Sequence, residues 1–384
     1  MNKKMLSTAV LAALFVSGCQ DEATAIAAPK QQHDVIIYNA NVVNVETGEI
    51  KKNAVIVLDD NAITLVGDKS ILANNHATEM LDAKDKYVIP GLWDMHVHFE
   101  GKKLVQDNAV LFPVYIAYGI TTVRDAAGDL GDQVLEWREQ VKQGKILGPQ
   151  IYTAGRKLEG IDSIWKGDLE IGTTDELNQA LDLLDSKHVD FVKITANTLK
   201  TDLFLEAIRA SKERGYKVSA HIPQKATVAE IVNAGVSSIE HASYMLRLGV
   251  PNEAELIAKV DAGEIKSSVV RKLYVSEFSQ ELANKRYEAL AAKSVAVTPT
   301  LIGGKQLAYL DENDHSNDDF QKYLSAEFMS HYAWRIGRMA NSTAEQIQAR
   351  KDRYQLIASQ IPHLVAAGVL VMAGSDSAAL NTFV

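Results

Sequence analysis

Hydrophobic and polar residues alternate with a period of two over residues 34–89, near the start of the chain. Two of these runs lie at residues 34–38 and 54–58, and turn-forming residues follow at 59–61 and 67–68. Alternation of this kind, broken by Asn, Asp and Gly, is typical of short strands that bury one face. The pattern predicts a small antiparallel β module, the N-terminal part of a β-sandwich.

From residue 88 onward, short apolar runs alternate with amphipathic helical stretches. Eight such runs occur, at residues 88–98, 120–125, 150–154, 191–194, 218–222, 237–241, 295–301 and 369–373. Helical periodicity fills most of the gaps, for example at residues 174–187 and 201–215. Strands that alternate with helices favour parallel βα units. The expected fold is therefore α/β, a closed (β/α)8 or TIM barrel over residues 90–384.

The connection between the sixth and seventh runs is longer than most of the others. Between residues 252 and 290 it is strongly helical and charged. We interpret residues 250–290 as a helical insertion in the barrel, placed to cover its mouth.

The first residues have the pattern of an export signal. Lys3 and Lys4 precede an apolar run at residues 5–16 that is too short to span a bilayer, and small residues follow it. The next residue, Cys19, is the only cysteine of the chain. Its position resembles the lipobox of bacterial lipoproteins, in which the cysteine becomes the lipidated first residue.

This resemblance implies a lipoprotein signal peptide at residues 1–18 and a flexible tether at residues 19–33. Gln20, in place of Asp directly after the cysteine, favours the outer membrane by the same resemblance. We therefore expect a periplasmic, lipid-anchored protein. The alternative is a plain signal peptide with a chance cysteine.

Composition and charge narrow the class of partner. The chain has 384 residues, 47% of them hydrophobic and 23% charged, with a formal net charge of −9. These values exclude a disordered chain and a collagen-like repeat, and one cysteine excludes a disulfide framework. An acidic chain has no positive electrostatic field that would attract nucleic acid or an anionic membrane surface. We expect a small-molecule substrate, no nucleic acid and membrane contact through the lipid anchor alone; a homo-oligomer stays open.

Histidines stand at the carboxyl ends of three predicted barrel strands. His96 and His98 alternate on the first strand, so both imidazoles can face one metal ion. His221 and His241 end the fifth and sixth strands, at the face where barrel enzymes place catalytic groups. Asp376 follows the eighth strand. Packing alone does not explain four histidines and an aspartate at strand ends, so we predict a metal site.

The motifs around these residues carry a family resemblance. They are PGLWDMHVH at residues 90–98, GITTVRD at residues 119–125, Lys193 within the fourth strand, the two single histidines and the terminal-strand aspartate. As a set they resemble the metal-dependent amidohydrolase superfamily, and within it the branch of imidazolonepropionase-like proteins and Xaa-Pro and Xaa-Arg/Lys dipeptidases.

The resemblance implies a role for each ligand. His96, His98 and Asp376 would bind a buried metal ion, His221 and His241 a more exposed one, and Lys193 would bridge both ions as a carbamate.

The chemistry of the bridging lysine can be argued separately. A lysine buried beside two cations has a lowered pKa, because burial and like charge both disfavour its ammonium form. The neutral amine can add CO₂, and the resulting anion has two oxygens that can join two divalent ions. Imidazole and carboxylate ligands suit Zn²⁺ best, with Mn²⁺, Co²⁺ or Fe²⁺ as alternatives.

Such a centre suits hydrolysis. Two divalent ions lower the pKa of water, so a bridging hydroxide can attack while Asp376 serves as general base and then as general acid. We predict hydrolysis of an amide bond, in a dipeptide or an N-acyl amino acid. Two alternatives stay open. One is a cyclic amide or imidazolone hydrolase, a chemistry that in relatives often uses one metal and no carbamate lysine, and the other is a non-catalytic periplasmic binding lipoprotein.

Residues in the loops after the strands are candidates for substrate binding. Tyr244 could donate to a carbonyl oxygen or a carboxylate, and Arg156, Lys157 or Lys305 could hold a carboxylate. After the third strand, relatives often carry Gly-Gly-His-Gly, whereas this chain has Arg-Lys-Leu-Glu-Gly at residues 156–160. The chain therefore departs from the dipeptidase pattern there.

The end of the chain sets a last expectation. The chain stops at Val384, shortly after Asp376, whereas family members continue with an eighth barrel helix and strands that return to the β module. We therefore expect the C-terminal helix and the returning sandwich strands to be missing, which would leave apolar surface and strand edges exposed.

Overall fold

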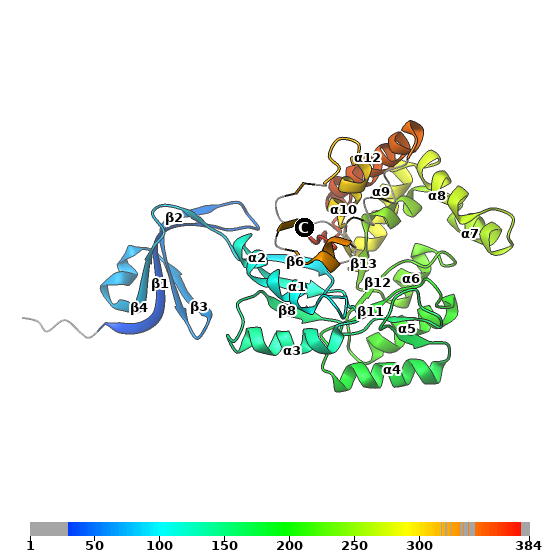
Figure 1. Ribbon diagram of the computed structural model, residues 1–384. Coiled ribbons are helices and arrows are strands. Elements are labelled where there is room, and N and C mark those ends of the chain that lie inside the picture. Colours follow the sequence, from blue (N-terminus) through cyan, green and yellow to red (C-terminus); the bar gives the residue numbers. More distant parts are fainter. Residues whose placement is uncertain are drawn as a thin grey trace, which may run out of the picture. The chain divides into compact units, whose positions relative to one another are not determined.

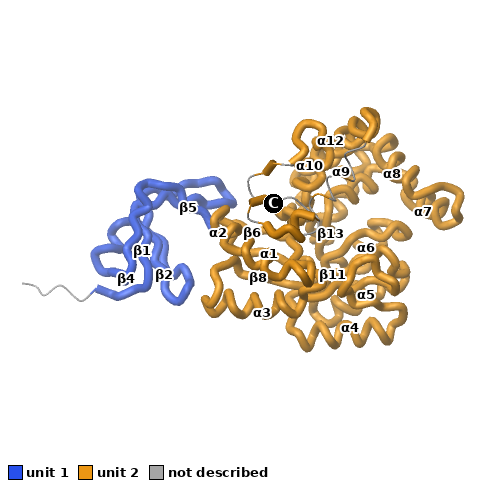
Figure 2. Tube along the Cα trace, viewed as in Figure 1, with its two compact units in different colours: residues 1–90 blue, residues 91–384 orange. Residues whose placement is uncertain are grey.

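The computed structural model describes residues 30–315, 317–318, 321–322, 324–330, 333, 337 and 342–377. The predicted signal peptide, Cys19 and most of the tether lie outside the described residues, as do residues 378–384. The chain forms two compact units, which divide between Pro90 and Gly91 (Figure 2). In the part of the chain that is described, no helix has both the length and the apolar character needed to cross a bilayer.

Unit 1 is built on one five-stranded sheet. Its strands are β1 Gln31–Val43, β2 Ile50–Asp59, β3 Ala62–Gly67, β4 Asn75–Asp82 and β5 Tyr87–Val88, and the 3-10 helix η1 Lys69–Ala73 precedes β4. β1 pairs with β2, and β2 with β3, in antiparallel fashion, but β4 and β5 pair with β1 in parallel. The expectation of a wholly antiparallel module was therefore wrong, because alternation along one strand carries no information on the direction of its partner.

The first strand begins earlier than expected. β1 starts at Gln31, so the predicted tether at residues 19–33 overlaps its first residues. The His33 ring explains this, because Nδ1 and Nε2 lie 2.7 Å from Asp59 Oδ2 and Asn75 Oδ1. These two contacts tie the start of β1 to β2 and β4.

The strands of unit 2 follow the predicted runs. They are β6 Leu92–Val97, β7 Ile120–Asp125, β8 Gln150–Thr153, β11 Val192–Ile194, β12 Val218–Ala220, β13 Ser238–Glu240 and β14 Ala296–Thr298. β6, β7 and β8 form one parallel sheet, and β11 to β14 pair in chain order within another. Parallel strands that pair in chain order, with helices between them, make this unit an α/β domain of the TIM-barrel-like kind.

The eighth predicted strand, at residues 369–373, is reduced to isolated bridges. Val371 pairs with Val297 of β14, and Ser377 pairs with Val97 of β6. The N–H of Asp376 also donates to a carbonyl oxygen of β6 at 2.7 Å. This segment therefore lies between β14 and β6 and brings Asp376 to the end of β6.

Helices separate the strands of unit 2 (Figure 1). They are α1 Val105–Val110, α2 Phe112–Ala117, α3 Gly131–Lys142, α4 Thr174–Ser186, α5 Thr201–Glu213 and α6 Val228–Ala234. In α4 the buried residues Leu177, Leu181 and Leu184 lie on one face and belong to the main core of the unit. Thr173 caps this helix by accepting a hydrogen bond from the N–H of Glu176.

Helices also fill the predicted insertion. Between β13 and β14 the chain forms the 3-10 helix η2 Ala242–Gly249 and the helices α7 Glu253–Asp261, α8 Ser267–Ser276 and α9 Gln280–Ala292. Two further helices, α10 Leu301–Ala308 and α12 Ala344–Ala366, follow β14. Tyr274 and Val275 of α8 and Ile357 of α12 share an apolar cluster with Ala242 and Leu246 of η2.

Two short strands after β8 were not predicted. β9 Leu158–Gly160 and β10 Leu169–Ile171 pair in parallel, and β9 joins β11 at Ile194. Glu159, in the middle of β9, is buried and accepts the backbone N–H groups of Asn197 and Leu199. A buried carboxylate in so short a strand masks the apolar pattern by which strands are found. These strands occupy the region where the chain departs from the dipeptidase pattern.

Candidate metal centre

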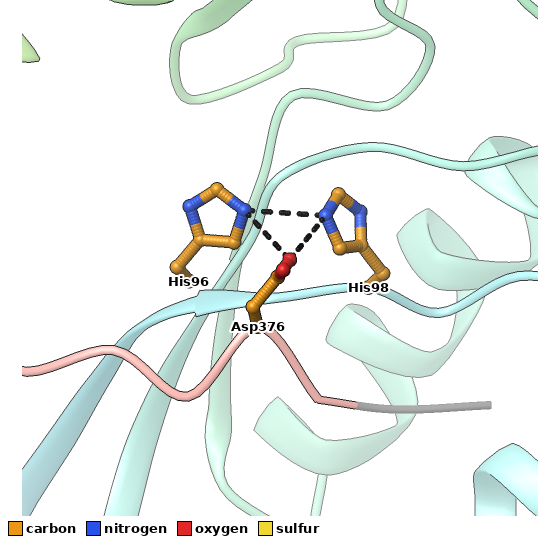
Figure 3. Close-up of side chains that lie close together, drawn as sticks. All are labelled: His96, His98 and Asp376. Carbon is orange, nitrogen blue, oxygen red and sulfur yellow. Dashed lines mark hydrogen bonds and ion pairs between the residues drawn. The ribbon is translucent and has the colours of Figure 1, made fainter. Parts of the chain in front are cut away.

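Three predicted ligands converge at the end of β6 (Figure 3). His96 Nε2 and His98 Nε2 lie 3.2 Å apart, and each lies 3.2 Å from Asp376 Oδ1. The two imidazoles face the same way because they stand two residues apart on an extended segment. Both histidines are buried and Asp376 is partly buried. The arrangement is a candidate metal site made of two nitrogens and one oxygen.

The contacts of the other ring nitrogen, Nδ1, determine which nitrogen of each histidine carries the proton. His98 Nδ1 lies 2.8 Å from the carbonyl oxygen of Ala127, and His96 Nδ1 lies 2.6 Å from Glu240 Oε2. Both oxygens accept, so each Nδ1 carries the proton and each Nε2 lone pair is left to bind a metal. Tetrahedral coordination with bonds of 2.0–2.1 Å would separate two nitrogen ligands by about 3.3 Å. The observed separation of 3.2 Å therefore fits a divalent ion.

His221 and His241 form a second pair of ligands beside the first group. Their Nε2 atoms lie 3.0 Å apart, and the ring of His241 lies 5.1 Å from the ring of His96. His241 Nδ1 lies 2.7 Å from Thr300 Oγ1, which orients the His241 ring. This pair fits a second ion near the first.

Lys193 lies in β11 and is fully buried at the same centre. Its Nζ has no hydrogen-bond partner among the described residues, although a buried polar atom without a partner is costly. Burial lowers the pKa of Lys193 to about 8, even though the charge of Glu240 raises it in part. An amine with a lowered pKa can add CO₂, and a carbamate would give this atom its missing partners. Lys193 therefore fits the bridging role that the resemblance implies.

Three of the candidate ligands, His221, His241 and Asp376, are in their metal-binding forms at neutral pH. Burial lowers the pKa of His241 to about 3 and holds the pKa of His221 well below its ordinary value. Burial acts to raise the pKa of Asp376, but its contacts with His96 and His98 and the neighbouring His241 outweigh this and hold the pKa well below its ordinary value, so the carboxyl is ionised. Neutral imidazoles and an ionised carboxylate are what a divalent ion requires.

We expect the metal-free protein to lose stability as the pH falls below about 6.5. In the unfolded chain His221 and His241 take up protons near that pH, whereas in the folded chain burial keeps them neutral to much lower pH. The unfolded state then binds more protons, so the free energy of unfolding falls with pH. Urea unfolding of the metal-stripped protein between about pH 7 and about pH 4 measures this. His241→Gln should show a shallower decline, and identical declines in the two proteins would contradict the expectation.

Glu240 is a buried carboxylate behind His96 that the sequence did not single out. It accepts hydrogen bonds from Arg124 Nη2 at 2.7 Å, from Ser219 Oγ at 2.7 Å and from Ser238 Oγ at 2.6 Å. Burial raises the pKa of Glu240, but Arg124 and His96 hold it well below its usual range. The ionised carboxylate thus orients His96 and makes it a stronger ligand.

Four residues at the centre have a strained backbone with positive φ. The φ angles of His241, Asp376, Thr300 and Ala127 are +73°, +61°, +47° and +73°. Each such residue costs of order 1–3 kcal/mol, and the β-branched threonine is the least usual of them. His241 and Asp376 are candidate ligands, and Ala127 and Thr300 hydrogen-bond the rings of His98 and His241. The surrounding fold therefore maintains a strained backbone where it positions the ligands.

Asp94 anchors the segment that carries Asp376. Its Oδ1 accepts the N–H of His96 at 3.1 Å and the N–H of Ser375 at 3.0 Å. One carboxylate therefore links β6 to the residue before Asp376, which fixes the two ligand segments relative to each other.

Five of the six candidate ligands, all except His96, line a cavity of about 190 Å³. Besides the ligands, its walls include Glu100, Lys157, Trp165 and Thr195. Lys157 Nζ pairs with Asp168 Oδ1 at 3.1 Å and lies 5.6 Å above the Trp165 ring. Asp168 therefore neutralises Lys157, the cation that sequence reasoning offered as a carboxylate ligand.

Tyr244, another of the four candidate substrate-binding residues, lies beside the centre. The ring of Tyr244, in η2, lies 6.3 Å from the ring of His221 and 6.4 Å from the ring of His241. Burial raises the pKa of Tyr244, so its hydroxyl stays protonated and able to donate at neutral pH.

The other two candidates have different surroundings. Arg156 lines a separate cavity and donates to the carbonyl oxygens of Gly167 and Asp168, so its substrate role stays a prediction. Lys305 is exposed on α10 and is not among the residues that line the metal cavity. A loop position at the end of a strand does not determine where a long side chain points.

Comparison with known proteins places the centre in a family context. The model of the amidohydrolase family matches residues 87–384, a range that contains all six proposed ligands. An adenine deaminase of Thermosipho africanus is 33% identical over 127 residues, which are 32% of this chain and 21% of that protein. A dihydroorotase of Carboxydothermus hydrogenoformans is 28% identical over 255 residues, 64% of this chain and 54% of that protein.

A solved structure shows the same fold. A Xaa-Pro dipeptidase with methionine bound in its active site aligns with 89% of this chain and 79% of its own, at 18% identity and a TM-score of 0.60. At that identity the likeness speaks for the fold alone. This chain spans less than two thirds of the length of the two curated relatives.

Proposed function

Because this chain belongs to the amidohydrolase family, we propose that it is a metal-dependent hydrolase of carbon–nitrogen bonds, which cleaves an amide bond in a dipeptide or an N-acyl amino acid. One observation carries the proposal, namely that metal-ligating side chains from five separate segments meet at one cavity. These side chains are His96, His98, Lys193, His221, His241 and Asp376.

The proposed cofactor is a pair of divalent ions, for which Zn²⁺ suits the donor set best. One ion would be held by His96, His98 and Asp376, the other by His221 and His241, with a carbamate on Lys193 between them. When bound, such ions activate the attacking water and polarise the scissile carbonyl group.

Asp376 moves the proton in this reaction. Its carboxyl is ionised, so the oxygen that does not face His96 and His98 can take a proton from the attacking water. The water oxygen bonds to the carbonyl carbon, the C–N bond breaks, and Asp376 returns the proton to the departing nitrogen. The products are a carboxylate and an amine.

Tyr244 is the proposed donor to the substrate. Its protonated hydroxyl, beside the rings of His221 and His241, can donate to the carbonyl oxygen of the scissile bond or to a carboxylate. Such a hydrogen bond becomes stronger as negative charge develops on a carbonyl oxygen.

Hydrolysis of a cyclic amide is the second candidate. The similarity to a dihydroorotase, which spans 64% of this chain, supports it. Lys193, buried and without a partner, favours the first candidate, because a carbamate bridge implies two ions.

An assay of the protein loaded with Zn²⁺ or Mn²⁺ against dipeptides, N-acyl amino acids and cyclic amides tests the proposal. We expect release of an amine from linear amides. Cleavage of cyclic amides alone would favour the second candidate. No cleavage by a protein that holds two ions would favour a non-catalytic binding lipoprotein.

We also propose that Cys19 carries the lipid anchor of an exported protein, on the strength of its position after the apolar run. Cys19→Ser should move the protein from the membrane fraction to the soluble periplasmic fraction and abolish incorporation of radiolabelled palmitate. A variant that stays in the membrane fraction would contradict the anchor.

A further inference from the structure

A second cavity lies beside the metal centre. Its volume is about 290 Å³, and its walls come from the ends of β11 and β12, from η2 and from helices α7 and α8. Thr195 and His221 line the metal cavity, and the residues that follow them, Ala196 and Ile222, line the second one. Tyr244 lines it too and has its ring 6.3 Å from that of His221. Consecutive residues thus line the two cavities, which makes the second one a candidate for the part of a substrate beyond the scissile bond.

The second cavity is apolar on one side and cationic on another. Its apolar walls are formed by Ile222, Ile257, Val260, Val270 and Tyr274. Two arginines also line it. Arg247 is neutralised, because it donates to Glu253 Oε1 at 2.7 Å and to the carbonyl oxygens of Pro223 and Ala226. Arg271 makes no ion pair or hydrogen bond with any described residue.

A further cation stands near Arg271. Burial lowers the pKa of Arg353, on α12, and the charge of the nearby Arg271 lowers it further. Tyr274 of α8 and Ile357 of α12 belong to one apolar cluster that includes residues of η2, which brings the two helices to the same part of the unit. Neither arginine has a carboxylate partner among the described residues. Arg271 is exposed and Arg353 is partly buried, so water screens part of their mutual repulsion, and a bound anion would relieve the rest.

We propose that Arg271 binds a carboxylate of the substrate in this second cavity and thereby selects amides that carry a free carboxylate and an apolar side chain. The inference rests on the proposed function and deepens it, because it names the residue that chooses the substrate. The guanidinium fork matches a carboxylate, the apolar walls match an aliphatic side chain, and Arg353 adds positive charge behind Arg271. Arg271 replaces the cations that sequence reasoning suggested for this role.

Two matched compounds test the proposal. N-acetyl-leucine and N-acetyl-leucinamide share the acetyl–nitrogen bond and the side chain, but only the first has a carboxylate. We expect the wild-type protein to release acetate from the first with a kcat/KM about 10-fold to 100-fold higher. Arg271→Gln should lower kcat/KM for N-acetyl-leucine by a similar factor and leave that for the amide unchanged. Arg271→Lys should retain part of the preference.

Lys272→Gln is the matched control, because Lys272 is exposed on the same helix and does not line the cavity. It removes the same charge and should change neither value. An unchanged preference in Arg271→Gln, or an equal loss in Lys272→Gln, would overturn the proposal.

Calorimetry measures how tightly the protein binds the same two compounds. Together with the cleavage assay, it distinguishes failure of this proposal from failure of the proposed function. If the wild-type protein cleaves neither compound but binds N-acetyl-leucine more tightly in an Arg271-dependent way, the hydrolytic function fails and the carboxylate site stands. If it cleaves both compounds with no preference, the hydrolytic function stands and the carboxylate site fails.

Discussion

Replacing Lys193 by alanine is expected to reduce bound metal to at most one ion per chain and to lower the rate of amide hydrolysis by about 10³-fold or more. The physical reason is that the variant loses the anion proposed to join the two ions, and several kcal/mol of transition-state stabilisation corresponds to a factor of this size. Metal analysis by mass spectrometry and steady-state kinetics on the same preparation measure both effects.

Two controls make this result specific to the bridge. Lys200→Ala removes an exposed lysine at the start of α5 and should leave metal content and rate unchanged. Adding a short carboxylic acid such as propionate should partly restore Lys193→Ala, because the small carboxylate can occupy the space of the missing side chain. A fully active Lys193→Ala protein with two bound ions would rule out the carbamate bridge.

Replacing Glu240 by alanine is expected to have the largest effect on stability. The substitution leaves the Arg124 guanidinium without its buried partner and removes the acceptor of His96 Nδ1. Loss of one member of a buried ion pair costs about 3–5 kcal/mol, and loss of the group that orients a metal-binding histidine weakens metal affinity about 10-fold to 100-fold. Urea unfolding and a competitive metal titration measure these two quantities.

Glu240→Gln separates the two roles of this carboxylate. Glutamine keeps the shape and one acceptor oxygen but loses the charge, so we expect an effect between those of the wild type and the alanine variant. Glu213→Ala, which removes an exposed carboxylate from α5, should change the free energy of unfolding by less than about 0.5 kcal/mol. An alanine variant of Glu240 as stable as this control would contradict the role assigned to the buried pair.

Features that depend on local pattern were predictable from the sequence. The period of two located the strands of unit 1, and short apolar runs located β6 to β8 and β11 to β14, because each strand must bury its own side chains whatever its partner. The ligands could be found for the same reason. His96 and His98 alternate on one strand, and His221 and His241 follow strands whose ends lie together in parallel βα architecture.

Features that depend on long-range contacts were not predictable. The parallel pairing of β4 with β1 and the bridges at Val371 and Ser377 arise between distant segments. Sequence reasoning also missed Glu240, although a glutamate beside a candidate ligand in a strand of small residues is a signal that could have been followed. Arg271 could not be found, because its place in the wall of the second cavity is set by the fold and not by a local sequence pattern.

The most direct test of the two-ion centre is a titration of the metal-stripped protein with Zn²⁺ in bicarbonate buffer. Bound metal per chain and the rate of acetate release from N-acetyl-leucine are measured on the same samples. We expect the rate to rise until two ions are bound per chain and then to level off. Full activity with one ion, or without any, would contradict a centre in which Lys193 joins two metal ions.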